Sequence, residues 1–255
     1  MKSNQKFKLL LVALFGGVGF FLLSGAIFPE NRQLIDATHH FTAIPFENHA
    51  FQITSWEFSP SDAVMEAIIE IESGTILPVE WNVEVVERTQ GLQDANIVHR
   101  NENALLIRIE NLRPTWREIG IRIFQGERSN QRLTLYTNHE HIKRVDELPL
   151  LTSREYEIKR VMYLMKGIEN ERETIQNQIL EHDSQIEALL NRIQELIDGT
   201  FITTEEARNA ERIIIRANDE IISHRSSITR LLDECSVLED RYTGFYFYLQ
   251  TLQSH

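Results

Sequence analysis

Two heptad repeats in the last hundred residues constrain the fold of this chain more than any other feature of its sequence. In the first repeat, one helix face carries Ile158, Val161, Met165, Ile168, Arg172, Ile175, Ile179, His182, Ile186, Leu189, Ile193 and Leu196. Ten of these twelve positions are apolar, and they alternate at intervals of three and four residues. Such a strict spacing predicts a coiled-coil seam and not the broader apolar stripe of an ordinary surface helix.

A short break separates this helix from a second one. Asp198 and Gly199 interrupt the first repeat, and the Thr-Thr-Glu-Glu stretch at 203–206 starts a new helix. The second seam consists of Ala207, Ala210, Ile214, Ala217, Ile221, His224, Ile228, Leu231, Cys235, Leu238, Tyr242, Phe245, Leu249 and Leu252. Because so short a connection forces the helices to lie antiparallel, we predict an antiparallel coiled-coil hairpin over residues 152–253. Its turn lies at 198–203, and its N-cap is Thr152 or Ser153.

Three polar side chains interrupt the seams, namely Arg172, His182 and His224. A polar residue in a coiled-coil core commonly fixes the register at some cost in stability, and we interpret all three in this way. A pH-sensitive pair formed by the two histidines is the alternative.

The position of the turn predicts which residues face each other. Counting outward from it places Ile179 opposite His224 and Ile168 opposite Cys235. This pairing predicts that Cys235, the one cysteine of the chain, is a small packed hydrophobe and not a nucleophile.

The apolar period changes to two between about residues 51 and 145, which is typical of half-buried strands. Met65, Ala67, Ile69 and Ile71 form one alternating run, and turn residues such as Ser73-Gly74 separate it from the next. Six or seven such runs predict an all-β immunoglobulin-like sandwich over residues 50–148, preceded by a linker at 30–49. We expect Trp81 in its core, and we place the recurring acids on a solvated sheet face: Glu66, Glu70, Glu72, Glu80 and Glu84.

Residues 1–29 have a third composition. Residues 9–28 contain no charged side chain, and Lys2, Lys6 and Lys8 precede them. A run of 20 residues is long enough to cross a bilayer, and lysines before it place the N-terminus in the cytoplasm. We therefore predict a short cytoplasmic tail and a transmembrane signal-anchor, with residues 30–255 outside the cell membrane. A signal peptide cleaved after Ala26, which would release a secreted protein, is the alternative.

Candidate chemistry is confined to histidines. His139 and His141 flank Glu140, and on a strand their imidazoles would share one face. They could begin a metal site together with other histidines of this module: His39, His40, His49 or His99. A surface turn explains the same residues more simply, so we assign no catalytic, cofactor-binding or metal residue and predict that the chain is not an enzyme.

The net charge of −12 arises from 38 acidic and 26 basic side chains and argues against nucleic-acid binding. The combined fold class is α+β multidomain: a transmembrane helix, a β-sandwich and a coiled-coil hairpin. We expect a membrane-anchored interaction or scaffold protein of a bacterial cell-envelope, secretion or surface-assembly system. It would bind the membrane through residues 9–28 and a protein partner through the hairpin and the sandwich. The alternatives are an extracytoplasmic metal-dependent hydrolase and a ligand-binding ectodomain that signals through a membrane partner.

Overall fold

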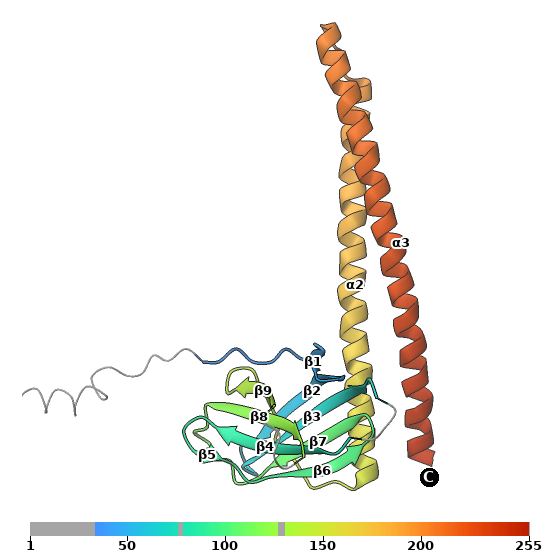
Figure 1. Cartoon of the computed structure of the whole chain (residues 1–255). Helices are drawn as coiled ribbons and strands as arrows, with labels where there is room; N and C mark the ends of the chain where they lie inside the picture. The colour runs from blue at the N-terminus through green and yellow to red at the C-terminus, as the bar shows by residue number, and fades with distance from the viewer. Residues whose placement is uncertain (1–33, 76–78, 127–130, 255) are drawn as a thin grey trace, which may run out of the picture.

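The computed structural model describes residues 34–75, 79–126 and 131–254. Two β-sheets are followed by two long helices, α2 (Ser153–Asp198) and α3 (Thr204–Ser254), which project from the sheets as a hairpin (Figure 1). The fold is therefore a β-sheet-rich domain with a helical arm at its C-terminal end.

The larger sheet has the strand order β1-β2-β3-β7-β6, with β10 pairing along β2. Its strands are β1 (Ile44–Phe46), β2 (His49–Ser59), β3 (Val64–Ser73), β6 (Ala95–Asn101), β7 (Ala104–Ile109) and β10 (Lys143–Arg144). The smaller sheet has the order β5-β4-β8-β9, with β4 (Trp81–Glu87), β5 (Gly91–Leu92), β8 (Glu118–Gln125) and β9 (Leu133–Asn138). Apart from the parallel β10–β2 pair, neighbouring strands run antiparallel.

The core lies between the two sheets. Its buried members include Phe51, Met65, Ile107 and Ile121, and Trp81 is 4% exposed within it. The expectation that Trp81 belongs to the core is confirmed. Met65, Ala67, Ile69 and Ile71 all face this interior, as their period of two predicts.

A β-bulge in β2 changes which side chains face the core. The register with β3 shifts between Ile53 and Ser55. Phe51 and Ile53 are core residues before the bulge, and Trp56 is one after it. One extra residue reverses the alternation of a strand, so the bulge directs Glu57 to the outer face of the sheet.

The helices α2 and α3 run side by side in opposite directions and are joined by residues 199–203 (Figure 1). Thr152 is the N-cap of α2, and it forms a capping box with Glu155. Near its N-terminus, α2 also packs on the outer face of the larger sheet, where Tyr156 forms a small cluster with Ile68 and Leu106. The hairpin is thus attached to the sheet along the first turns of α2.

The structure does not support the prediction of a membrane-spanning helix. None of the helices formed by residues 34–75, 79–126 and 131–254 is long and apolar enough to cross a membrane, because α2 and α3 carry charged side chains every few residues. The predicted tail and anchor, residues 1–29, lie outside the described residues, as do residues 30–33 of the predicted linker. The fold class with an N-terminal transmembrane helix, and the single-pass membrane localisation derived from it, rested on the hydropathy of residues 9–28 and the lysines before them, and neither is supported.

Candidate functional site

A buried network of charged side chains joins α2 to the larger sheet. The network, called the base network below, consists of Glu57, Glu66, Glu70, Arg108, Lys143, Glu157, Lys159 and Arg160. Five of these residues are less than a tenth exposed: Glu57, Glu66, Arg108, Glu157 and Arg160. The sheet and the first turns of α2 both contribute charges, so ion pairs cross the junction between them.

Glu66 lies at the centre of the base network. Its Oε1 accepts hydrogen bonds from Arg108 Nη1 at 2.6 Å and from the Tyr156 hydroxyl at 3.0 Å. Its Oε2 accepts from Lys159 Nζ at 2.6 Å. Lys159 also pairs with Glu57 Oε2 at 2.8 Å. One carboxylate of β3 is therefore held by one sheet residue and two helix residues.

Arg160 forms a second bridge between α2 and the sheet. Its guanidinium donates from Nε at 2.7 Å and from Nη2 at 2.6 Å to the two carboxylate oxygens of Glu70, and from Nη1 to Glu157 Oε1 at 2.7 Å. A two-pronged arginine–carboxylate pair fixes orientation as well as distance. His99 adds a further contact, because its Nε2 lies 2.9 Å from Glu157 Oε2. A bulge between Ile97 and His99 directs this imidazole toward the helix.

The charges of the base network balance, with four carboxylates and four cations. Burial alone raises the pKa of the Glu57 carboxyl, but hydrogen bonds from Lys143, Lys159 and Tyr163 outweigh it and hold the pKa below its usual value. Burial lowers the pKa of Lys159, and its bonds to the two glutamates reverse this and raise it. These contacts favour the charged forms of Glu57 and Lys159. At Glu70, by contrast, burial outweighs the contacts with Arg160 and raises the pKa of that carboxyl.

We had predicted that the recurring acidic residues all lie on a solvated sheet face, and this prediction is wrong for Glu66 and Glu70. Glu66 is 3% exposed and Glu70 is bound to Arg160, whereas Glu72 and Glu80 are exposed. Sequence periodicity shows that Glu66 and Glu70 point away from the core, but it does not show that a helix covers that face. The one sequence feature that could have indicated this helix is the pair of adjacent basic residues near the start of α2, Lys159 and Arg160, which could pair with the acids of β3.

Phe41 makes a close contact with α2 at Gly167, about two helical turns beyond the base network. A Cβ atom built on Gly167 would lie 2.3 Å from Cε1 of the Phe41 ring, so only glycine allows this approach. Gly167 is buried in α2, and Phe41 precedes β1. This contact therefore holds the segment before the first strand against the hairpin.

We expect Gly167→Ala to destabilise the protein by about 1–3 kcal/mol, because overpacking displaces the Phe41 ring. The matched control is Gly244→Ala in α3, where an added Cβ meets nothing within 4 Å. That change should stabilise the protein by about 1 kcal/mol, the helix preference of alanine over glycine. Urea unfolding of both variants checks the prediction, and stabilisation by Gly167→Ala would contradict the close contact.

The facing seams of α2 and α3 bury a second apolar cluster. Its fully buried members are Ile168, Ile175, Leu231 and Leu238. Cys235 is partly buried and packs against this cluster, in agreement with its prediction as a packed side chain. The cluster stabilises the arm independently of the sheets.

The register of the two helices differs from the predicted one. His182 Nδ1 lies 2.9 Å from His224 Nδ1, so the partner of His224 is His182 and not Ile179. Side chains lean toward the N-terminus of their own helix. In an antiparallel pair, the side chains that meet therefore belong to residues C-terminal to those with level Cα atoms. The sequence-based pairing matched residues whose Cα atoms are equally far from the turn, and it did not include this lean of the side chains.

A crosslinking experiment tests the register. In a chain carrying Cys235→Ser, the double variant His182→Cys/His224→Cys should form an intramolecular disulfide on mild oxidation, because the two side chains meet across the seam with Nδ1 atoms 2.9 Å and ring centroids 5.1 Å apart. The pair Ile179→Cys/His224→Cys is the control and should link poorly. Faster linkage of the control on a non-reducing gel, or linkage only between chains, would refute the observed pairing.

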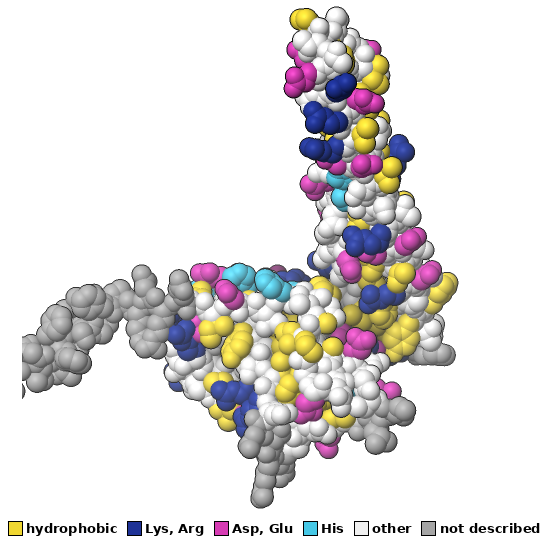
Figure 2. Space-filling model, turned by 45° about the horizontal axis from the view of Figure 1, so that its top comes forward, with side chains coloured by type: hydrophobic (Ala, Val, Ile, Leu, Met, Phe, Trp, Pro, Cys, Tyr) yellow, Lys and Arg dark blue, Asp and Glu magenta, His cyan; other side chains and the backbone are white. Residues whose placement is uncertain are grey.

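The free end of the hairpin exposes apolar side chains, which we call the tip patch: Ile197, Phe201 and Ile202. They are 60%, 40% and 91% exposed, and Figure 2 shows hydrophobic and acidic side chains at this end. The connection is ordered, because Glu206 Oε2 accepts hydrogen bonds from the backbone N–H groups of Ile202 at 2.9 Å and of Thr203 at 3.0 Å.

Acidic residues predominate around the tip patch, with Arg192 and Arg208 at its edges and Arg192 paired with Glu195 at 2.7 Å. Residues 193–207 contain Glu195, Asp198, Glu205 and Glu206, and no lysine or arginine. Isolated exposed apolar residues are common on protein surfaces. Three neighbours within an acidic frame instead form a surface suited to recognition.

The candidate histidines are distributed over several places. His39, His40 and His141 line one depression of about 480 Å³, and the Nδ1 of His141 is held by Asn138 Oδ1 at 2.9 Å. His99 belongs to the junction with α2, and His49 lies at the end of the sheets. Burial and the neighbouring charge of His39 lower the pKa of His40. His139 lies beside Glu140, with Nε2 4.0 Å from its Oε1.

These histidines do not assemble a metal centre. In the part of the chain that the structure describes, no three His, Cys, Asp or Glu side chains are grouped so that they could hold a metal ion. Comparison of the chain with family models, curated proteins and solved structures finds no match.

Proposed function

We propose that this chain is an interaction or scaffold protein that uses a coiled-coil hairpin to carry the tip patch to a protein partner. The observation that supports this most directly is the contrast between the two ends of the arm. Buried ion pairs clamp its base to the sheet, whereas its free end exposes three neighbouring apolar side chains. The 46 residues of α2 separate these ends by about 69 Å at ~1.5 Å per residue.

The composition of the tip indicates the chemistry of the partner. Burying an exposed isoleucine and phenylalanine in a partner surface lowers the free energy of the complex. The surrounding acids favour a partner surface of opposite charge. The partner surface should therefore be an apolar cleft with lysine or arginine at its rim. This role does not depend on a membrane anchor.

Site-specific photocrosslinking tests the proposal in cells that naturally make the protein. A photoreactive amino acid at Phe201 should give one major adduct, and Ile202→Asp in the same chain should abolish it. The same probe at Leu232, which is 54% exposed midway along α3, is the control and should give no such adduct.

The adduct should map to an apolar cleft with a basic rim, and with the purified partner Ile202→Asp should weaken Kd by about tenfold or more. An adduct formed equally from Leu232, or one that survives Ile202→Asp, would overturn the assignment of the tip.

A further inference from the structure

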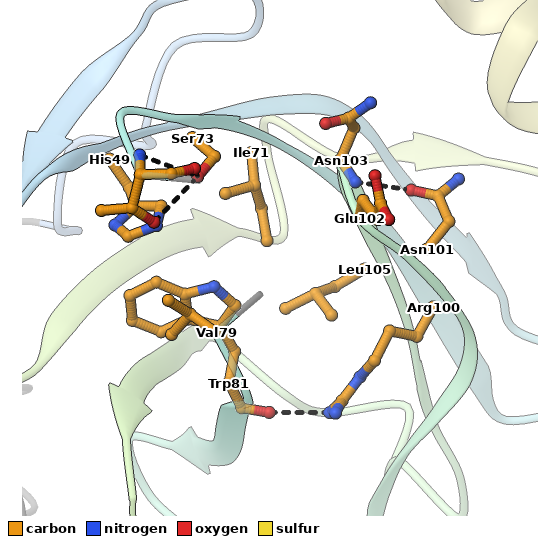
Figure 3. A pocket seen from close by; sticks show the side chains of 11 residues that line it. His49, Ile71, Ser73, Val79, Trp81, Arg100, Asn101, Glu102, Asn103 and Leu105 are labelled. Carbon is orange, nitrogen blue, oxygen red and sulfur yellow. Dashed lines mark hydrogen bonds between the residues drawn. The ribbon is translucent and has the colours of Figure 1, made fainter. Parts of the chain in front are cut away.

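A cavity of about 590 Å³ opens at one end of the sandwich (Figure 3). Five strands begin or end there: β2 begins at His49, β3 ends at Ser73, β4 begins at Trp81, β6 ends at Asn101 and β7 begins at Ala104. The cavity is far from the tip patch along the chain and does not rest on the proposed function.

One wall of the cavity is apolar and draws on both sheets. Ile71 and Leu105 come from the larger sheet, Trp81 begins β4 of the smaller sheet, and Val79 lies just before β4. Figure 3 shows these four side chains converging on the same space. A wall of this kind suits the hydrocarbon or aromatic body of a small molecule.

Arg100, whose side chain is 39% exposed, supplies a cation beside the backbone of Trp81. Its Nη2 donates to the Trp81 carbonyl oxygen at 2.7 Å, and Nη1 lies 3.8 Å from Glu80, whose side chain is 85% exposed. These contacts position the guanidinium without using all of its five N–H donors. A positioned guanidinium next to an apolar wall favours a carboxylate.

His49 supplies a second polar atom. The residue is 8% exposed, and its ring packs edge-on against Trp81 with centroids 5.0 Å apart. Within the described ranges, its buried Nδ1 has no hydrogen-bond partner. That nitrogen is enclosed by protein, whereas Nε2 of the same ring is neither enclosed nor hydrogen-bonded among the described residues. Buried polar side chains are nearly always paired in folded proteins, so a ligand group in the cavity that pairs with Nε2 would satisfy it.

We propose that the cavity binds a small monocarboxylate whose apolar body lies on Trp81 and whose far end carries a hydroxyl group. Arg100 binds the carboxylate and His49 binds the hydroxyl. Glu102 also lines the cavity and is exposed, and its charge disfavours a second carboxylate on the ligand.

Calorimetry on the full chain with 4-hydroxyphenylacetate tests the proposal. We expect saturable binding with a Kd on the order of 1 mM or tighter for a ligand of this size. Tyramine replaces the carboxylate by an amine and should bind about tenfold more weakly or not at all. Phenylacetate lacks the hydroxyl and should bind several-fold more weakly in the unaltered chain.

Variants assign the two polar contacts. Arg100→Gln should weaken the binding of 4-hydroxyphenylacetate about tenfold or more. Arg122→Gln on β8 is the control and should not, because the Arg122 side chain is 42% exposed and does not line the cavity. His49→Gln should remove most of the preference for the hydroxylated acid. Equal binding of 4-hydroxyphenylacetate and tyramine by the unaltered chain would overturn the proposal, and this result does not depend on the folding of any variant. An unchanged Kd in Arg100→Gln would also overturn it.

Discussion

Glu66→Gln should lower the free energy of unfolding by about 3 kcal/mol or more. The substitution keeps the shape of the side chain but removes its charge, and it leaves Arg108 and Lys159 with one carboxylate fewer at 2.6 Å each. Removing one partner of a buried ion pair leaves an uncompensated buried charge, which costs about 3–5 kcal/mol. Urea unfolding measures the change.

The control for this prediction is Glu72→Gln on the same strand. Glu72 is exposed, so its substitution should change stability by about 0.5 kcal/mol at most. Hydrogen exchange locates the effect: in Glu66→Gln, the amides of residues 156–168 should lose protection first. Equal stability of the two variants would show that the base network contributes nothing net.

Leu231→Ala should cost about 2–5 kcal/mol, because it empties a space in the seam cluster. Leu231 is 4% exposed and packs with Ile168, Ile175 and Leu238. The adjacent Leu232 is 54% exposed, so Leu232→Ala removes the same atoms from a solvent-exposed position of α3. That control should stay within about 0.5 kcal/mol of the parent protein.

The pair Leu231 and Leu232 separates seam packing from helix propensity, because both variants exchange leucine for alanine in one helix. Unfolding followed by circular dichroism compares them. Similar losses in the two variants would mean that α3 is not stabilised by the facing seam of α2.

The long elements of this fold could be predicted from the sequence because their signals are local and repeated. Heptad spacing identified the helices, and their turn was visible at Asp198 and Gly199. The register was wrong by three residues, since it depends on the lean of side chains such as His182 and not on spacing alone.

The junction between α2 and the sheet could not be predicted, because it depends on tertiary packing. Glu66 and Glu70 have the period of an outer sheet face, and that period is the same whether water or a helix covers the face. Phe41 and Gly167 lie far apart in the chain, and no local pattern connects them. The polar lining of the end cavity likewise comes from strand ends distant in sequence.

The buried ion pairs at its base should make the hairpin a stiff arm held at a fixed angle to the sandwich. Spin labels at Leu92→Cys and Leu180→Cys in a Cys235→Ser chain test it, since both leucines are exposed, at 70% and 66%. Leu180 lies about 40 Å along α2 from its start at ~1.5 Å per residue, within the range of pulsed dipolar spectroscopy. The account predicts one narrow distance distribution that broadens in Glu66→Gln, and a broad distribution in the chain with an intact Glu66 would contradict it.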